Sequence, residues 1–262
     1  MAASRSANAE GHDLRWSPAL DVAVLGAGGA AWGISEALKG ALVPSTCRWC
    51  EPDAIDRGAR DALRWDARSS AASASDWIAF GAAPASALVT LGLAMGHDRA
   101  PWHDVAQDAV LVGEATVLAM DLDQLAKFAV ARERPFAYAP VPGEAVDPAD
   151  PEDRVSFFSG HTTWTFALAA STGTVATLRG YRWAPFTWAI GGPLAAVTGY
   201  LRVAADKHWL TDVVTGAIVG AGIGILVPVA FHGRSSDGPP ISPTSAAALG
   251  PAPVDAALSF PW

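Results

Sequence analysis

The sequence predicts an all-α protein, a six-transmembrane-helix bundle whose polar loops gather on one face. Hydrophobic residues make up 51% of its 262 residues and charged residues only 17%, whereas soluble domains carry about 25% charged residues. Tryptophan occurs 11 times, often near the ends of apolar stretches, as in the aromatic belts of membrane interfaces. These stretches show no sustained alternation of period two, so helices are favoured over barrel strands.

Six apolar stretches are each about long enough to cross a ~30 Å hydrocarbon core. Charged residues within them, such as Glu36, Lys39 and Glu114, are expected to face a bundle interior or a polar cavity, because charge is costly in lipid. A soluble protein with buried helices is the alternative. The stretches are Leu20–Val43, Trp77–Met95, Val105–Leu125, Phe157–Leu178, Pro185–Leu201 and Trp209–Phe231.

Glycine recurs at every fourth position in two of the stretches. Gly216, Gly220 and Gly224 lie in the last stretch, and Gly29 and Gly33 in the first. Small residues at this spacing let helix backbones approach closely in a membrane. We therefore expect close helix packing at both sets of glycines.

One membrane domain, residues 17–232, is expected between two less ordered ends. Residues 1–16 are polar, with no apolar segment of a cleavable signal peptide, and are predicted to be flexible. Residues 233–262 are rich in Pro, Ala and Ser and are predicted to be disordered. The net charge of −8 argues against a nucleic-acid partner. The oligomeric state is left open.

Six spans would place both termini on one side and the loops after the first, third and fifth spans on the other. The first of these loops, Pro44–Asp76, contains arginines three to four positions apart, with acidic residues between them. This spacing predicts a surface amphipathic helix with internal ion pairs, with a mobile lid as the alternative. The charged residues are Arg57, Arg60, Arg64, Arg68, Asp56 and Asp61.

The same loop contains both cysteines, Cys47 and Cys50. A zinc site would need two further ligands, and there is no second cysteine pair. A local disulfide is favoured, with two unpaired thiols as the alternative.

Basic residues mark the end of the third stretch. Lys127 and Arg134 lie two helical turns apart, so both are expected on one face of a helix that Pro135 ends. With Arg132 they could equally form a basic cluster at a membrane boundary.

Ser159, Gly160 and His161 precede an apolar run and so mark a helix start. Ser159 is expected to be the N-cap. Free backbone N–H groups there can bind an anion, and Gly160 permits close approach. Ordinary capping, with His161 uninvolved, is the alternative.

His208 and Asp212 lie one helical turn apart at the start of the last stretch. The carboxylate is expected to accept a hydrogen bond from one ring nitrogen, which leaves the other nitrogen free to attack. Arg202 adds a planar fork that suits phosphate oxygens. A surface His–Asp pair that caps a helix is the alternative.

Together, these segments resemble the tripartite signature of the type-2 phosphatidic acid phosphatase superfamily, written KxxxxxxRP, PSGH and SRxxxxxHxxxD. The matching residues are Lys127–Pro135 (KFAVARERP), Ser159–His161 (SGH) and Arg202–Asp212 (RVAADKHWLTD). Phe158 and Leu201 stand where the family has proline and serine. The missing hydroxyl at position 201 could weaken phosphate binding or alter which substrate fits.

The resemblance implies a role for each matching residue. His208 would be the nucleophile, forming a phosphohistidine, with Asp212 orienting it. His161 would protonate the leaving oxygen and later help to activate water. No metal or cofactor is expected. The phosphate oxygens would be held by Lys127, Arg134, Arg202, Ser159 and the Gly160 amide.

The resemblance also implies a function: hydrolysis of a lipid phosphate or lipid pyrophosphate by a multi-pass protein of the cytoplasmic membrane. The active face is expected outside the cytoplasm, with the bilayer and a membrane lipid as partners. Phosphatidic acid, phosphatidylglycerol phosphate and polyprenyl pyrophosphate are the candidate substrates.

Three alternatives stay open. The superfamily also includes vanadium-dependent haloperoxidases, which would use the same pocket for oxidation. A non-catalytic phospholipid-binding or transport protein would keep the pocket without turnover. From a different class, Gly26-x-Gly28-x-x-Ala31 after an apolar run, with Glu51 further on, is similar to a dinucleotide-binding turn.

Overall fold

The computed structural model describes residues 12–140, 147 and 149–235. It confirms the all-α prediction, since every regular element in this part of the chain is a helix. The elements are α1 (Pro18–Ala37), α2 (Lys39–Leu42), α3 (Ala54–Leu63), α4 (Arg68–Trp77), η1 (Ile78–Ala82), α5 (Ala83–Gly96), α6 (Trp102–Val130), α7 (Pro135–Tyr138), η2 (Pro151–Arg154), α8 (Gly160–Arg179), α9 (Ala184–Ala204) and α10 (Leu210–His232).

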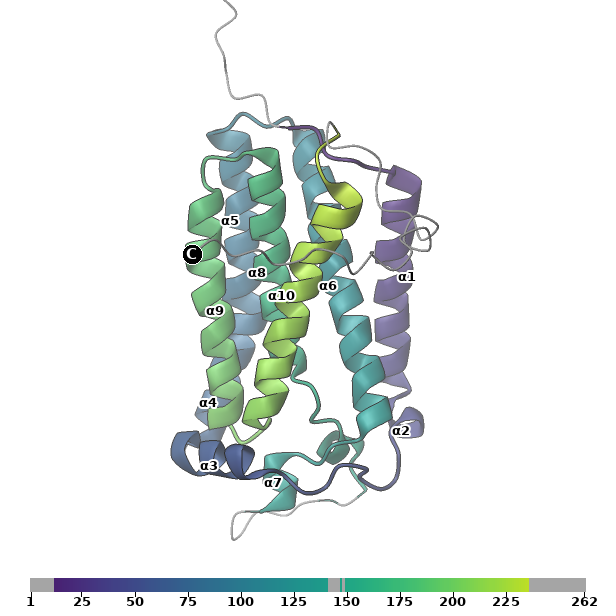
Figure 1. Cartoon of the computed structure of the whole chain (residues 1–262), viewed down its shortest axis with the longest axis vertical. Coiled ribbons are helices and arrows are strands. Elements are labelled where there is room, and N and C mark those ends of the chain that lie inside the picture. The colour runs from purple at the N-terminus through teal and green to yellow at the C-terminus, as the bar shows by residue number, and fades with distance from the viewer. Residues whose placement is uncertain (1–11, 141–146, 148, 236–262) are drawn as a thin grey trace, which may run out of the picture.

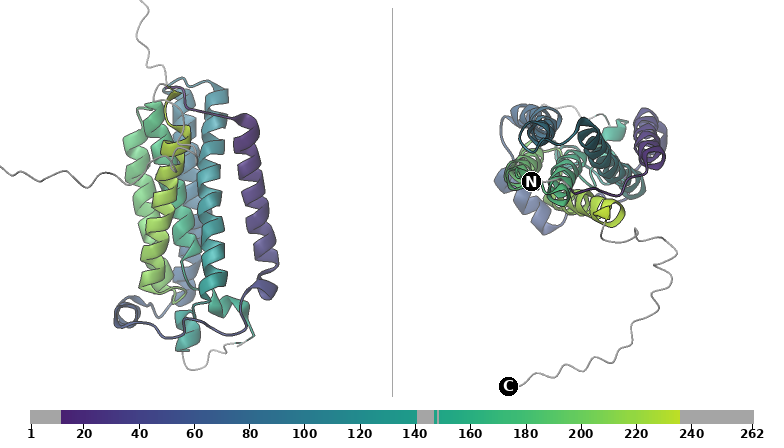
Figure 2. Two further views of the ribbon diagram at one scale, coloured as in Figure 1. Left: turned by 45° about the vertical axis from the view of Figure 1, so that its right-hand side comes forward. Right: turned by 90° about the horizontal axis from the view of Figure 1, so that it is seen from above.

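The long helices run side by side along one axis, and the short ones lie at one end (Figures 1 and 2). α8 is central and packs against α6, α9 and α10, whereas α1 lies at the edge and packs mainly on α6. The loops after the first, third and fifth apolar stretches meet at the end that carries α2, α3 and α7 (Figure 1). The predicted convergence of these loops is therefore confirmed.

Glycines bring α10 and α8 into close contact. A Cβ added at Gly216, Gly220 or Gly224 would lie within 3.0 Å of backbone oxygens of α8 or of Ser159, the residue before it. This packing was predicted from the glycine spacing. The prediction is wrong for Gly29 and Gly33, whose positions have no described atom within 4 Å; they face away from α6.

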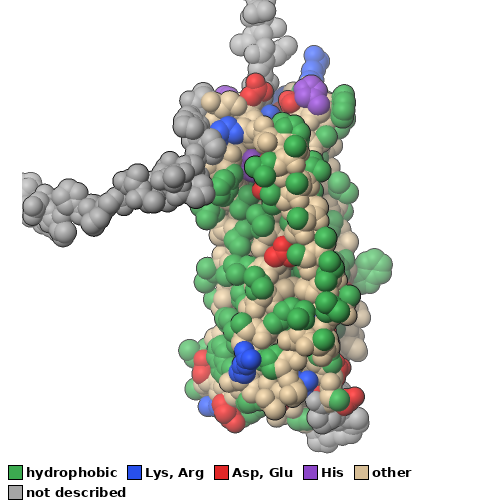
Figure 3. Space-filling view, turned by 90° about the vertical axis from the view of Figure 1, so that its right-hand side faces the viewer, with side chains coloured by type: hydrophobic (Ala, Val, Ile, Leu, Met, Phe, Trp, Pro, Cys, Tyr) green, Lys and Arg blue, Asp and Glu red, His purple; other side chains and the backbone are tan. Residues whose placement is uncertain are grey.

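The exterior of the bundle is apolar and much of its interior is polar. Large hydrophobic side chains are exposed along the helices, for example Ile34 at 60%, Leu88 at 67% and Ile218 at 68%. Figure 3 shows hydrophobic side chains along the face formed by α1, with charged groups gathered mainly towards its two ends. Buried threonines, serines and charged groups fill the inside. Such a distribution is unusual for a monomer in water, where large contiguous apolar surfaces are rare.

Each of the six predicted stretches falls largely within a helical segment. The second helix starts earlier than expected, because α4, η1 and α5 form one continuous helix from Arg68 to Gly96. Within the described part of the chain, two helices are long and apolar enough by composition to cross a membrane, Arg68–Gly96 and Leu210–His232. The count of six spans stays a prediction.

The dinucleotide-binding alternative is wrong. Val22–Ala31 lies inside α1, so the strand and turn that such a site needs are missing there. A flexible N-terminus was predicted for residues 1–16 and a disordered tail for residues 233–262; of these, residues 1–11 and 236–262 lie outside the described residues. Next to them, Leu14 and Arg234 form an antiparallel bridge.

Candidate active site

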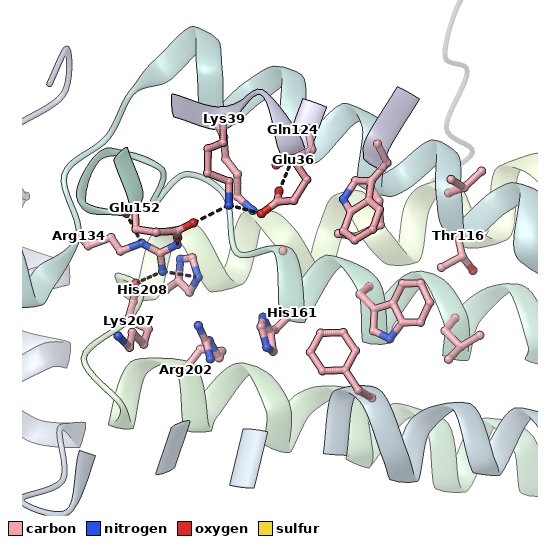
Figure 4. A pocket seen from close by; sticks show the side chains of 18 of the residues that line it. Glu36, Lys39, Thr116, Gln124, Arg134, Glu152, His161, Arg202, Lys207 and His208 are labelled. Atoms are coloured by element: carbon pink, nitrogen blue, oxygen red, sulfur yellow. Dashed lines mark hydrogen bonds and ion pairs between the residues drawn. The ribbon is translucent and has the colours of Figure 1, made fainter. Parts of the chain in front are cut away.

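A cavity of about 1020 Å³ opens at the loop end of the bundle between α1, η1, α6, α8 and α9. One part of its wall is charged and the other part apolar. Figure 4 shows Arg134, His161, Arg202, Lys207 and His208 pointing towards a common space. The apolar part is lined by Leu25, Trp32, Phe80, Val117, Met120, Trp164 and Leu168.

His208 lies in the loop between α9 and α10 and is only 2% exposed. Its Nδ1 lies 2.8 Å from the carbonyl oxygen of Ser156. A carbonyl only accepts hydrogen bonds, so Nδ1 carries the proton and Nε2 is unprotonated. Nε2 lies 3.3 Å from Nη1 of Arg134. Burial, followed by the nearby charges of Arg134 and Arg202, holds the pKa of His208 well below its usual range.

The predicted hydrogen bond between Asp212 and His208 is wrong, since Asp212 Oδ2 lies 3.8 Å from Nδ1. The carboxylate instead accepts hydrogen bonds from the Ser156 hydroxyl at 2.6 Å and the Trp209 amide at 2.9 Å. The Ser156 carbonyl takes the position next to the ring. Asp212 therefore fixes the two backbone segments that flank His208, rather than the imidazole itself.

A buried chain of charges continues from Asp212 to α3. Arg132 is 1% exposed, donates to Asp212 and Asp56 at 2.5 Å each, and stacks on Trp49. Asp56 also accepts a hydrogen bond from the Thr211 amide at 2.9 Å. Sequence analysis missed this network. The presence of Asp56 and Arg60 on one face of a short helix was its only signal.

α3 was predicted as a surface amphipathic helix with internal ion pairs. Most of its residues are exposed, as predicted, but the internal pairing is wrong for Arg60. Arg60 pairs with Asp206, which lies just before His208, at 2.7 and 2.8 Å. Asp56 is fully buried. The helix therefore supports the loop that carries His208. The favoured disulfide of this region is present and joins Cys47 to Cys50.

Arg134 does not continue the helix of Lys127, contrary to prediction. α6 ends at Val130, because Ala131 takes a left-handed conformation with φ 46°. The following residues pair instead with loops: the Glu133 amide donates to Trp49 and the Arg134 amide to Asp153. Both cations still line the cavity.

Two acidic residues neutralise these cations. Lys127 pairs with Asp123 at 2.6 Å. Arg134 donates to the Glu152 carboxylate at 3.0 Å, and Lys39 of α2 contacts the same carboxylate at 2.5 Å (Figure 4). Burial would raise the pKa of Glu152, but Arg134 and Lys39 together lower it. Glu152 therefore stays charged and occupies the guanidinium that a phosphate would need.

His161 lies in the first turn of α8, and its Nε2 is 2.8 Å from a carboxylate oxygen of Asp76. Arg202 is 7% exposed and contacts Ser75 at 3.1 Å and Asp76 at 3.4 Å. Its Nε has no hydrogen-bond partner among the described residues. An anion in the cavity would supply that acceptor. Asp76 was not singled out from the sequence, because it belongs to none of the motifs.

Ser159 and Gly160 differ in their access to the cavity. Gly160 lines it, and a Cβ there would lie 2.8 Å from Nζ of Lys127. Ser159 occupies the N-cap position of α8, as predicted, but makes no side-chain cap hydrogen bond. Its hydroxyl accepts from Thr162 at 2.9 Å and is fully buried. Its predicted contact with phosphate would need that hydroxyl to turn.

The chain is similar to known proteins over the part that forms this pocket. Residues 108–236 match the PAP2 superfamily. The chain is 34% identical over 111 residues to an undecaprenyl-diphosphatase from Sulfolobus acidocaldarius. The aligned region covers 42% of this chain and 48% of that relative. It thus spans about half the length of that relative.

Among solved structures, it is similar to the first transmembrane PAP2 type phosphatidylglycerolphosphate phosphatase from Bacillus subtilis. That similarity has 20% identity and a TM-score of 0.35 over 66% of this chain and 90% of that one. All three signature segments fall within the family match. The similarity to the PAP2 superfamily thus rests on residues 108–236, which include His161, Arg202 and His208 of the pocket.

Proposed function

We propose that the protein is a membrane phosphatase that hydrolyses a lipid phosphate or lipid pyrophosphate through a phosphohistidine. The observation that carries this proposal is the cavity's division into a charged end and an apolar end. Arg134, Arg202 and Lys207 line the first, where a phosphate would bind, and residues such as Trp32 and Met120 line the second, where an acyl or prenyl chain would lie. A soluble phosphate ester would need only the first.

In the first chemical step, Nε2 of His208 attacks phosphorus. A nitrogen–phosphorus bond forms as the bond from phosphorus to the lipid oxygen breaks. His161 gives a proton to that oxygen, and the Asp76 carboxylate, 2.8 Å from its Nε2, holds the ring in position. Water then attacks the phosphohistidine while His161 takes its proton. Phosphate leaves, and both histidines return to their starting states.

Fixed cations would stabilise the negative charge of the transition state. Arg134, Arg202 and Lys127 would share the equatorial oxygens as charge moves from phosphorus to the leaving group. Two observations support this placement. Nε of Arg202 has no hydrogen-bond partner among the described residues, and Nη1 of Arg134 contacts Nε2 of His208. Catalysis by this set of residues requires no metal ion.

A bilayer would cover the apolar exterior. Hydrophobic side chains that are more than half exposed, such as Leu20, Leu88 and Ile218, would then face lipid. We propose six spans, with the pocket end outside the cytoplasm. A single cysteine introduced at Asp147 should react in intact cells with a membrane-impermeant reagent; protection there with labelling after lysis would reverse the orientation.

The name of the Sulfolobus relative favours lipid diphosphates among the candidate substrates. Lys39 supports the same idea, because it lies beyond Arg134 on the other side of Glu152. A diphosphate that displaced this carboxylate could place its second phosphate near Lys39. A monophosphate would leave that lysine paired with Glu36.

A phosphate-release panel in detergent tests the proposal. Phosphatidic acid, phosphatidylglycerol phosphate and polyprenyl pyrophosphate are each offered in EDTA, with His208→Ala as the background. Release from at least one lipid, inhibited by vanadate, is expected. Release that depends on an added divalent ion would contradict the metal-free mechanism. Lipid binding without any release would favour the binding or transport alternative.

A further inference from the structure

A second cluster of ionisable groups lies at the other end of the bundle. Asp21 stands in the first turn of α1, Glu114 lies in α6, and His232 is the last residue of α10. His208 precedes the start of α10, and a helix of 23 residues is about 35 Å long. The cluster is thus remote from His208, although the apolar end of the active-site cavity reaches Gly113, next to Glu114.

These three side chains are buried and converge. Asp21 is 4% exposed, Glu114 7% and His232 4%. One ligand atom from each lies within 4.8 Å of the others. All three line a separate cavity of about 900 Å³. They come from three different helices, so the fold rather than a local motif brings them together.

The imidazole of His232 is held in the tautomer that a metal ligand needs. Its Nδ1 lies 3.2 Å from the carbonyl oxygen of Arg15, which can only accept, so Nδ1 carries the proton. Nε2 faces Oε2 of Glu114 at 3.3 Å. Neither Nε2 nor Oε2 has a hydrogen-bond partner among the described residues. Backbone carbonyls commonly hold metal-ligating histidines in this way.

The distance between these two atoms also fits an ion. Ligands about 2.0–2.1 Å from a tetrahedral zinc ion lie about 3.4 Å from each other, close to the 3.3 Å between Nε2 and Oε2. The Asp21 carboxylate is oriented from outside by the Ser17 amide, which donates to its Oδ2 at 2.8 Å. One neutral imidazole and two carboxylates offer two negative charges to a divalent ion.

We propose that Asp21, Glu114 and His232 bind a divalent transition-metal ion of the zinc type, with water completing the coordination. Mixed nitrogen and oxygen ligands suit zinc or manganese better than calcium or magnesium. The ion would tie α1, which packs mainly on α6, to α6 and α10 together. Its role is to hold the helices, and it takes no part in phosphate chemistry. The proposal stands apart from the enzymatic one and departs from the expectation of no metal.

The test uses the full chain without an affinity tag, purified in detergent and stripped with EDTA. Zinc chloride is added, and bound metal is counted after desalting. One ion per chain is expected, together with a rise in the unfolding temperature. Cobalt(II) chloride should give the intense visible bands of a tetrahedral nitrogen–oxygen site. No retained zinc and no cobalt bands would overturn the proposal.

Variants locate the ion. Glu114→Gln, His232→Ala and the milder Asp21→Asn should each weaken zinc binding by at least about 10-fold. The control is His103→Ala, a histidine whose side chain is 66% exposed; it should bind zinc as the unaltered protein does. Unchanged binding in the cluster variants would refute the site. If a variant does not fold, the cobalt spectrum of the unaltered chain still decides between a metal site and a plain ion pair.

Discussion

Glu152 is predicted to compete with substrate for the phosphate-binding cations. Its carboxylate contacts Arg134 at 3.0 Å and Lys39 at 2.5 Å, and a phosphate can bind Arg134 fully only after displacing it. The Glu152 side chain is 44% exposed, so each ion pair is of the solvent-screened kind, which contributes about 0.2–1 kcal/mol. Two such pairs amount to about 0.4–2 kcal/mol, or a change of about 2- to 30-fold in affinity.

The assay is the competitive inhibition constant of vanadate or inorganic phosphate. Glu152→Gln should lower this constant about 2- to 30-fold, with the larger effect at low salt because screening is weaker there. Glu133→Gln is the matched control, since it removes the same charge from the same region but does not line the cavity. Weaker inhibition of Glu152→Gln, or an equal change in both variants, would show that Glu152 helps to build the phosphate site instead of blocking it.

Three further outcomes follow from the site. Arg132→Ala leaves the carboxylates of Asp56 and Asp212 buried without their cation, which should lower the free energy of unfolding by about 3–5 kcal/mol and abolish turnover; exposed Arg48→Ala should do neither. Because its lowered pKa keeps His208 neutral in mild acid, kcat/KM with an aryl phosphate substrate should stay constant as the pH is lowered to values below 6.5. A fall in kcat/KM that already begins above pH 6.5 as the pH is lowered would contradict the assignment. His161→Ala should lose about 10²–10⁴-fold with lipid phosphates and recover partly with a p-nitrophenyl ester, whereas equal rescue of His208→Ala would contradict the division of roles.

The sequence predicted the bundle and most of the pocket, because those features have local signals. Apolar stretches of membrane length define the helices, and each of the three motifs places its residues at a boundary between an apolar stretch and a loop. Because consecutive long helices run in opposite directions, the loops after the first, third and fifth stretches lie at one end (Figure 1). That reasoning correctly placed Lys127, Arg134, Gly160, Arg202 and His208 in one cavity.

The contacts between these residues could not be predicted, because they join segments far apart in the chain. Arg132 was interpreted as a boundary cation, yet it is buried between Asp56 and Asp212. A single left-handed residue, Ala131, ends α6 and turns Arg134 out of the helix. Neither the periodicity of the sequence nor the spacing of its motifs reports such a turn. The same holds for the cluster of Asp21, Glu114 and His232, since its members belong to three helices.

The central claim is that Nε2 of His208 carries the phosphoryl group during turnover. A rapid alkaline quench of the enzyme with ³²P-labelled lipid phosphate tests it most directly, because phosphohistidine survives alkali and is lost in acid. The unaltered protein should show acid-labile label at His208, His161→Ala should retain label with an aryl phosphate, and His208→Ala should show none. Label on the His208→Ala protein, or turnover of the unaltered protein without any trapped label, would contradict the mechanism.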